Sequence, residues 1–225
     1  MKSIALFIAL LLALLALPML MPSGPGQRPD ANPVTLPWQI ELLPDGGSRV
    51  FGLTLGRSTL QDARQQLGGD VQVALIVAPG ETGSLEAYYE SIDAGAVKGK
   101  MVMTLETSLA QREQILARAR KVDYMQSAAR RVEPGADDLL LADRAPIIAI
   151  AFIPAANLDE QVVLQRFGVP GERIRSSEYK EHFLYPDKGL DLQLDAKGKE
   201  VLQYVAPRDF ARLRAPLSTS TTTAR

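Results

Sequence analysis

The sequence predicts an α+β protein made of two tandem helix-plus-antiparallel-sheet units behind an N-terminal hydrophobic helix. Three observations lead to this prediction. A short capped helix that stops at glycine occurs twice, as STLQDARQQLGG at residues 58–69 and as NLDEQVVLQRFGVP at residues 157–170. Each copy is followed by three strand patterns separated by turn residues. Residues 4–21 are apolar and free of charge.

The composition is that of an ordinary globular protein and narrows the possible functions. The chain has 225 residues, 46% hydrophobic and 23% charged, so it can bury a core as one large or two small domains. A formal net charge of -1 gives no general attraction to nucleic acid, which is therefore not an expected partner. The absence of cysteine excludes thiol catalysis, thiolate metal sites, disulfides and the acylated cysteine of bacterial lipoproteins.

The N-terminal residues 1–22 predict a membrane segment. The uncharged run at residues 4–21 is at the lower limit of length for crossing a bilayer, and Lys2 favours a cytoplasmic N-terminus. We therefore expect an uncleaved signal anchor in the bacterial inner membrane, with the rest of this single-pass chain in the periplasm. The alternatives are a cleaved signal peptide, which would leave a soluble periplasmic protein, and a buried soluble helix. Residues 23–37 are rich in proline and glycine and predict a stiff linker.

The first unit is expected at residues 38–145. Strands are predicted at residues 38–43 and 49–55, joined through the turn PDGG. Ser58 is the expected N-cap of the first helix, within a capping-box pattern, and Gly68 ends that helix. Three further strands are then predicted, at residues 71–77, 85–92 and 97–106.

A long connecting helix and a buried strand are expected next. Ser108 has an N-cap pattern, and apolar residues keep near-helical spacing as far as Val132, which predicts a helix over residues 108–132. Its basic residues spread around the cylinder, which favours a solvated surface over a face that lies on a membrane. Residues 133–145 are expected to form an acidic loop. The apolar run at residues 146–154 predicts a strand buried on both faces.

The second unit is expected at residues 146–213, followed by a disordered tail at residues 214–225. Asn157 is the expected N-cap of its helix, which ends before Gly168. Strands are predicted at residues 178–185, 189–195 and 199–205. The middle strand alternates, which predicts a buried face with Leu190, Leu192 and Leu194 and a wet face with Asp191, Gln193 and Asp195.

A family resemblance rests on three segments, GRSTLQDARQQLGG (56–69), NLDEQVVLQRFGVP (157–170) and GLDLQLDAKGKEVLQYV (189–205). They resemble the small outer-membrane assembly lipoproteins of the SmpA/OmlA family, which are helper subunits of the β-barrel assembly machinery. The tandem arrangement is also similar to that of the secreted β-lactamase inhibitor proteins, which consist of two such α/β units. The resemblance covers residues 50–106 and 146–207. Because the lipoproteins' acylatable cysteine is absent, the N-terminal helix would be the tether and would hold the chain at the inner membrane.

No residue set in the sequence identifies a reaction, so we expect a protein that is not an enzyme and has no cofactor and no metal. His182 is the single histidine, and its strand position beside charged neighbours predicts a surface or edge residue. A hydrolase that uses His182 with an unidentified serine is the catalytic alternative. The clustered aspartates lack calcium-loop spacing, and the glycine-containing turns lack phosphate-loop spacing.

Aromatic residues on corresponding strands of the two units give the expected binding site. Tyrosine is common at protein-binding surfaces, and an exposed sheet face can bind a partner, although one ring of each pair can instead fill the core. We therefore expect a non-catalytic cell-envelope protein that binds another envelope protein, in envelope assembly or maintenance. An inhibitor or modulator of a periplasmic enzyme is the alternative. The expected binding residues are Tyr88, Tyr89, Tyr179, His182, Phe183 and Tyr185.

Overall fold

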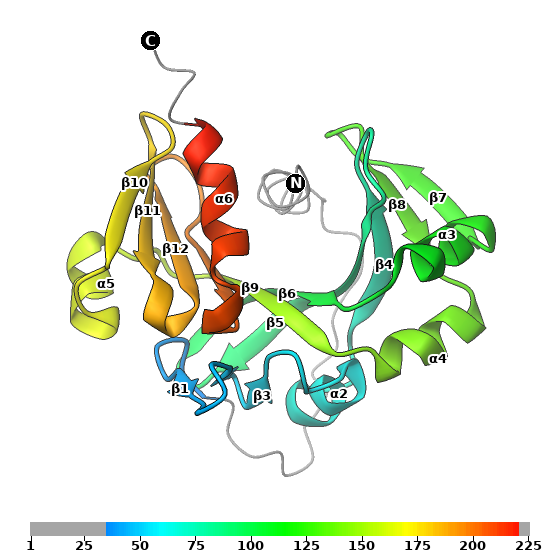
Figure 1. Ribbon diagram of the computed structural model, residues 1–225, viewed down its shortest axis with the longest axis horizontal. Coiled ribbons are helices and arrows are strands. Elements are labelled where there is room, and N and C mark those ends of the chain that lie inside the picture. Colours follow the sequence, from blue (N-terminus) through cyan, green and yellow to red (C-terminus); the bar gives the residue numbers. More distant parts are fainter. Residues whose placement is uncertain (1–34, 221–225) are drawn as a thin grey trace.

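The computed structural model describes residues 35–220 and has an α+β architecture with antiparallel sheets (Figure 1). The main sheet has ten strands in the order β10-β11-β12-β13-β9-β6-β5-β4-β8-β7. Its strands are β4 (Gln72–Val77), β5 (Ser84–Ala94), β6 (Val97–Leu105), β7 (Lys121–Tyr124), β8 (Arg130–Glu133), β9 (Ile147–Pro154), β10 (Glu172–Arg175), β11 (Lys180–Tyr185), β12 (Leu190–Asp195) and β13 (Val201–Val205). The α-helices are α2 (Leu60–Leu67), α3 (Leu109–Ala117), α4 (Ala136–Arg144), α5 (Glu160–Phe167) and α6 (Ala211–Ser220), and the 3-10 turns are η1 (Pro186–Lys188) and η2 (Pro207–Asp209).

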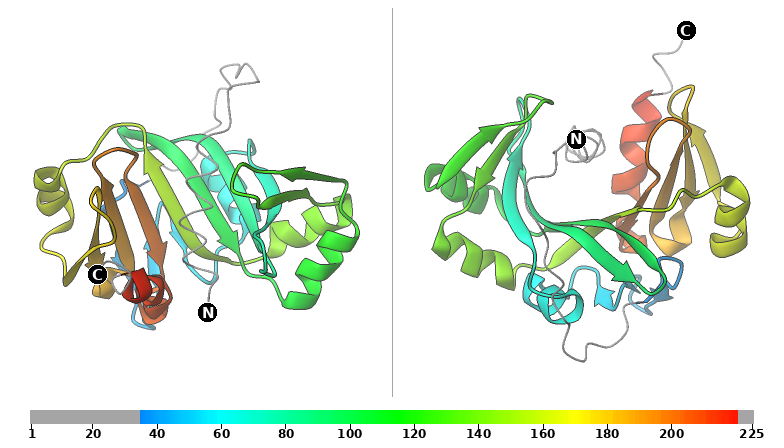
Figure 2. Two further views of the ribbon diagram at one scale, coloured as in Figure 1. Left: turned by 90° about the horizontal axis from the view of Figure 1, so that it is seen from above. Right: turned by 180° about the vertical axis from the view of Figure 1, so that it is seen from behind.

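The ten-stranded sheet is strongly curved, so that it has a convex outer face and a concave inner face (Figures 1 and 2). Helices α2, α3, α4 and α5 lie on the outer side, and α6 lies on the inner side. Strands β10 and β7 are the two edges of the sheet. The curvature therefore separates an outer layer of helices from an inner concavity.

The main hydrophobic core lies on the outer face. Burial of each large side chain there stabilises the fold by about 1.5–3 kcal/mol relative to an exposed one. Helices α2 and α5 pack on this face through residues that include Leu60 and Phe167. One row of cross-strand neighbours runs through six strands, and its members, each at most 2% exposed, are Phe183, Leu192, Leu202, Phe152, Met101 and Tyr89.

The inner face is covered at both ends, which corrects the prediction of a wet face on β12. Helix α6 packs Leu213 and Leu217 against Leu184 and Val205. At the other end, Met125 of the turn after β7 packs in a cluster with Ala74, Ile76, Ala78 and Ala129. The predicted wet residues of β12 are buried: Asp191 and Gln193 are each 1% exposed and Asp195 is 9% exposed.

Both predicted short helices form, but their N-caps lie one and two residues later than expected. Thr59 caps α2 in a capping box with Asp62, and Asp159 caps α5 by accepting a hydrogen bond from Val162 N at 2.7 Å. The two side chains that were predicted as caps make other hydrogen bonds. The Ser58 hydroxyl accepts from Thr54 N at 3.0 Å, and the Asn157 side chain accepts from Lys199 Nζ at 2.8 Å.

The long helix predicted over residues 108–132 is wrong. Its first part is α3, and the chain then forms the β7–β8 hairpin, whose second strand pairs with β4. This pairing places Val132 opposite Leu75 and buries it completely. Residues 136–144, expected in an acidic loop, form α4, with Asp137 and Asp138 in the first turn where the helix dipole favours negative charge. The buried strand expected at residues 146–154 is confirmed as β9.

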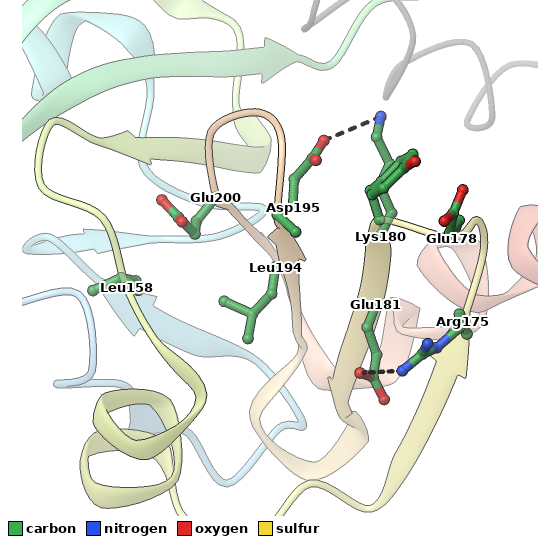
Figure 3. Close-up of a pocket in the computed structure, with 10 residues that line it drawn as sticks. Leu158, Arg175, Glu178, Lys180, Glu181, Leu194, Asp195 and Glu200 are labelled. Carbon is green, nitrogen blue, oxygen red and sulfur yellow. Dashed lines mark hydrogen bonds and ion pairs between the residues drawn. The ribbon is translucent and has the colours of Figure 1, made fainter.

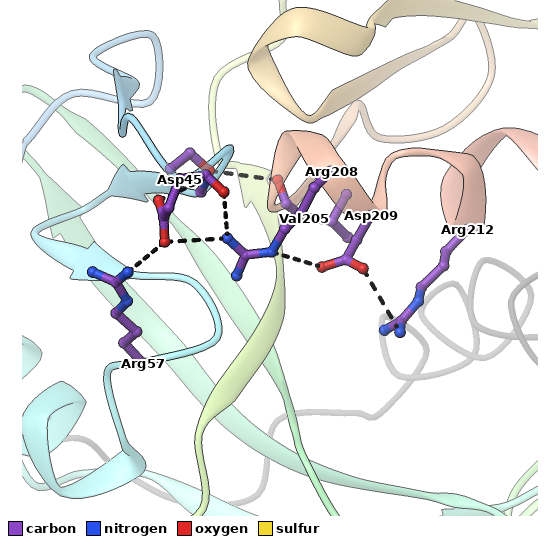
Figure 4. A network of polar contacts seen from close by, with 8 residues as sticks. Asp45, Arg57, Val205, Arg208, Asp209 and Arg212 are labelled. Atoms are coloured by element: carbon purple, nitrogen blue, oxygen red, sulfur yellow. Dashed lines mark hydrogen bonds and ion pairs between the residues drawn. The ribbon is translucent and has the colours of Figure 1, made fainter.

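The predicted N-terminal hairpin is a small three-stranded sheet of β1 (Glu41–Leu42), β2 (Ser48–Val50) and β3 (Leu53–Thr54). Positive φ angles at Phe51 (55°) and Gly52 (79°) divide the second predicted strand into β2 and β3. A polar network joins this sheet to the C-terminal elements (Figure 4). Asp45 pairs with Arg57 and, at 3.4 Å, with Arg208 of η2. The hydrogen bond from Gly47 N and the two guanidinium groups lower the pKa of Asp45.

Several predictions lie wholly or partly outside the described residues. The N-terminal helix at residues 4–21 and most of the linker at residues 23–37 are among them. Within residues 35–220, no helix is long and apolar enough to cross a membrane. Helix α6 extends to Ser220, so that the part of the expected disordered tail before residue 221 is helical.

Candidate functional site

The six residues predicted to bind a partner do not form one surface, because neighbouring residues on a strand point to opposite faces. His182 lies on the same face of the sheet as Leu184, against which α6 packs, and so faces inward with Tyr88. Tyr89, Phe183 and Tyr185 belong to the outer core and are at most 4% exposed. Tyr179 lies between β10 and β11, is 37% exposed, and has Lys197 Nζ 3.4 Å from its ring centroid.

Two of these tyrosines have matching structural roles. The Tyr89 hydroxyl donates to Gly68 O at 2.9 Å, and the Tyr185 hydroxyl donates to Gly168 O at 3.0 Å. Each glycine ends the preceding helix with a positive φ, 103° for Gly68 and 84° for Gly168. Burial raises the pKa of both tyrosines to about 12, so both hydroxyls stay protonated donors at neutral pH. The two tyrosines therefore hold helix ends onto the sheet.

His182 is buried, at 1% exposure, and the expected surface or edge position is wrong. Its Nδ1 lies 3.0 Å from both carboxylate oxygens of Asp191, which is also 1% exposed. Its Nε2 lies 3.0 Å from Ser176 Oγ. Because an ionised carboxylate only accepts hydrogen bonds, Nδ1 carries a proton, and in the neutral ring Nε2 is left to accept from the Ser176 hydroxyl.

Three adjacent strands bring these side chains together. On β11, His182 lies opposite Ile174 of β10 and opposite Gln193 of β12. Ser176 directly follows β10, and Asp191 lies two residues from Gln193, so both are diagonal neighbours of His182 on the inner face. The role of Ser176 was not apparent from the sequence because the local pattern does not predict β10. The His182–Asp191 pair could have been found from the register of the predicted β11–β12 hairpin.

Two buried glutamines continue this polar group along the inner face. Gln193 lies opposite His182, and Gln203 of β13 lies opposite Asp191. Each is 1% exposed, and neither amide nitrogen nor amide oxygen has a hydrogen-bond partner among the described residues. Leaving such a buried group unpaired costs about 1–3 kcal/mol. These amides therefore offer free hydrogen-bonding groups beside the histidine.

A small cavity lies at the other end of the inner face and is called the Tyr88 pocket. It has a volume of about 80 Å³ and is lined by Gln72, Ala74, Ile76, Glu86, Tyr88, Glu90, Met125 and Arg131. Burial raises the pKa of Glu86 to about 7, against the lowering effect of its hydrogen bond from Ser84. The Tyr88 hydroxyl donates to Glu90, which also pairs with Lys100 at 2.6 Å. The pocket thus combines apolar walls with a carboxyl group that changes charge near neutral pH.

One row of cross-strand neighbours connects the two ends of the inner face. The row contains Asp191, Gln203, Ala151, Val102, Tyr88 and Gln72. In its middle, Val102 and Ala151 cluster with Ile153 and Val201, and Tyr88 packs at the border of this cluster. The inner face therefore runs from the His182 group through an apolar centre to the Tyr88 pocket.

A larger pocket of about 300 Å³ lies near the turn between β10 and β11 (Figure 3). Ion pairs cross it between Lys180 and Asp195 at 3.6 Å and between Arg175 and Glu181 at 3.5 Å. Its lining residues are Leu158, Arg175, Glu178, Tyr179, Lys180, Glu181, Leu194, Asp195, Ala196 and Glu200. The pocket therefore contains Tyr179 and lies beside the chain segment of Ser176.

Most of the clustered aspartates in the sequence are paired with basic side chains. Asp138 pairs with Arg118, and Asp143 pairs with Arg64 at 2.9 Å. Asp191 pairs with His182. Within the described part of the chain, no three or more His, Cys, Asp or Glu side chains are grouped so that they could hold a metal ion.

The comparisons with known proteins do not assign this arrangement to a class. No protein-family model matches the sequence, and no curated protein and no solved structure matches it significantly. The function must therefore be argued from the geometry of the inner face.

Proposed function

We propose that this chain is a cell-envelope protein that binds another envelope protein through the inner face of its sheet, in envelope assembly or maintenance. The observation that supports this most directly is the Tyr88 pocket, with half-buried Tyr88 at its border and a space of about 80 Å³. Water occupies about 30 Å³ in the liquid, so the pocket has room for one small aliphatic side chain of a partner. A buried aromatic border around such a pocket is typical of protein-binding hot spots.

The shape of the sheet also supports this proposal. Helices α2 to α5 lie on the outer face of the curved sheet (Figure 2), whereas the inner face carries half-buried Tyr88 and its pocket. A concave face of this kind can enclose a segment of a partner, and the curvature increases the contact area for a given width. The charged lining of the Tyr88 pocket, with Glu90 and Arg131, would fix the orientation of that segment.

We further propose that the fold consists of two tandem units behind an N-terminal anchor. The hydrogen bonds of Tyr89 to Gly68 O and of Tyr185 to Gly168 O support the first part. In both cases a short helix ends at glycine and a tyrosine from the second following strand holds that end. The likeness to the SmpA/OmlA and β-lactamase inhibitor proteins, and the location at the inner membrane facing the periplasm, stay proposals that rest on the sequence.

Two site-specific photo-crosslinking positions test the binding proposal in intact cells. A photoreactive phenylalanine analogue at Tyr88 and another at Gln72, both on the Tyr88 pocket, should trap the same partner. The matched control is the same analogue at Leu164, on the outer helix α5 and 36% exposed, which should not trap it. The proposal fails if the two pocket positions trap nothing, trap only a second copy of the chain, or give the same products as position 164.

The identity of the trapped chain distinguishes the inhibitor alternative from a role in envelope assembly or maintenance. If it is an enzyme, the purified protein should lower or change its rate in a titration, and Tyr88→Ala should weaken that effect at least tenfold. If the partner is not an enzyme, or if its rate is unchanged at saturation, the inhibitor alternative is excluded.

A further inference from the structure

We propose that Ser176 is an activated nucleophile and that the chain hydrolyses small carboxylic esters with His182 as the proton carrier. This goes beyond partner binding and runs against the expectation of a non-catalytic protein. The proposal rests on two sets of distances: Ser176 Oγ to His182 Nε2 is 3.0 Å, and His182 Nδ1 to the two oxygens of Asp191 is 3.0 Å each. Hydroxyl, imidazole and carboxylate in this order are the arrangement that activates a serine.

The accessibility of the three groups fits this role. The base and the carboxylate are each 1% exposed, so water does not compete for their hydrogen bond, whereas Ser176 is half-buried at the end of β10. Asp191 holds one tautomer of His182, with the proton on Nδ1, and stabilises the imidazolium that forms during the reaction. The Ser176 hydroxyl completes the hydrogen bonding of His182 Nε2, and because Ser176 is half-buried its oxygen can also be reached from solvent.

The reaction can be written with protons and bonds balanced. The Ser176 oxygen attacks the ester carbonyl carbon while its proton moves to His182 Nε2. The bond from the carbonyl carbon to the alcohol oxygen breaks, and the departing oxygen takes the proton from Nε2. Water then attacks the acyl-serine, giving a proton to Nε2, and this proton returns to Ser176 as the carboxylic acid leaves. The net change is ester plus water to acid plus alcohol.

The surroundings favour a compact acyl group and supply polar partners for it. The backbone N–H groups of Ser176 and Ser177 both donate to Lys180 O, at 3.1 and 3.4 Å, and are not free to stabilise the oxyanion. The unpaired amide of Gln193, opposite His182 on the same face, is the donor that the structure offers. Because Ser176 is only partly exposed, the proposal takes small esters as its substrates.

Covalent labelling with a fluorophosphonate tests the nucleophile directly. The probe reacts with activated serines, and peptide mass mapping locates the adduct. Wild-type protein should give one adduct on Ser176, and Ser176→Ala should give none there. The control residue is Ser177, whose hydroxyl accepts from Tyr179 N and Lys180 N within the turn. The variant Ser177→Ala should label like wild type.

The proposal is overturned if folded wild-type protein gives no Ser176 adduct while a known serine hydrolase in the same tube is fully labelled. This outcome does not depend on any variant being folded. Asp191→Asn, close to the native side chain in size, should slow labelling at least tenfold, with circular dichroism used to confirm the fold. Unchanged labelling in Asp191→Asn also overturns the proposal, because the serine would then not depend on the histidine's orientation.

Hydrolysis of p-nitrophenyl acetate gives the second readout. Ser176→Ala should lower the wild-type kcat/KM at least tenfold at pH 8. If Ser176→Ala and wild type hydrolyse the ester at the same rate, the three residues have only a structural role and the proposal is wrong.

Discussion

The carboxyl group of Glu86 is the clearest case of a single residue held in an unfavourable environment. It is 6% exposed on β5, where burial raises its pKa from 4.5 to about 7. The hydrogen bond from Ser84 Oγ to Glu86 Oε1 at 2.6 Å opposes this rise but does not cancel it. The folded protein therefore keeps a proton that the unfolded chain would release between about pH 4.5 and pH 7.

Replacing Glu86 by Gln should change the pH dependence of stability. Because the raised pKa favours proton binding in the folded state, wild-type stability should fall as pH rises from 4.5 to 7 and level off above that, by about 3 kcal/mol in total. Gln has no proton to lose, so Glu86→Gln should match wild type at pH 4.5 and exceed it at pH 8. Urea unfolding across this range measures both, and Glu113→Gln on the exposed side of α3 should follow wild type.

The two helix-end tyrosines give a matched pair of substitutions. Tyr89→Phe and Tyr185→Phe each remove one donor and leave a glycine carbonyl without that partner. Each should lower the free energy of unfolding by about 1 kcal/mol, and the two effects should be similar and additive. Tyr124→Phe is the control, since Tyr124 is 79% exposed and should show no change. An effect from only one of the two would contradict their equivalence.

Residue-scale prediction from sequence succeeded where local rules decide and failed where cross-strand partners decide. The glycine stops at Gly68 and Gly168 follow from helix termination alone. The Asn157 side chain binds Lys199, 42 residues later, which a local pattern does not reveal, whereas Ser58 accepts from Thr54 N, only four residues earlier. His182 was expected at the surface because its sequence neighbours are charged, but alternation turns it inward, away from Glu181.

At the element scale, the turn before β12 offers a test of backbone geometry. Gly189 has a φ of 65°, and a Cβ there would lie 2.0 Å from Val205 O and 3.0 Å from Pro207 N. Both obstacles are backbone atoms that cannot rotate away. Gly189→Ala should therefore lower the free energy of unfolding by at least about 3 kcal/mol.

The control for this substitution isolates the strain of a positive φ. Gly80 has a φ of 77°, but a Cβ there would meet nothing within 4 Å. Gly80→Ala should cost only about 1 kcal/mol. Chemical denaturation of the two variants gives the comparison, and equal costs would mean that the Val205 contact does not limit the turn.

The element that the sequence predicted worst is the segment after α3. Its apolar residues keep near-helical spacing, yet β7 and β8 form because pairing with β4 buries Val132 beside Leu75. Such a gain depends on Leu75, 57 residues earlier than Val132, so a local pattern does not contain it. The edge strand β10 was missed because its four residues include one apolar side chain, Ile174. Its arginines pair with Glu160 and Glu181, contacts that a local pattern does not contain.

At the scale of the whole molecule, one continuous sheet joins both halves of the chain. Strand β9 pairs with β6 on one side and with β13 on the other, and Tyr204 of β13 donates to Pro37 O at 2.9 Å. The network of Asp45 and Arg208 adds a further link between the two ends of the described chain (Figure 4). The α+β class was predictable from periodicity, but this shared sheet was not, since it requires pairing between distant strands.

Because both halves of the chain contribute strands to one sheet, unfolding should be a single transition. Trp38, the only tryptophan in the sequence, packs against Phe167 of α5 with ring centroids 6.4 Å apart, and its fluorescence reports on that region. Far-UV circular dichroism reports on the whole sheet. The two signals should give the same urea midpoint within error. Separate midpoints would show that the two halves fold independently despite the shared strand β9.

The position of β9 also determines at which point of synthesis both edges of this strand can be paired. Its β6 partner precedes it in the chain, but β13 is made last among the strands. Until residue 205 has emerged, a nascent chain therefore displays an apolar strand with one open edge, which is a template for association with other chains. Early termination between β9 and β13 should consequently yield insoluble product.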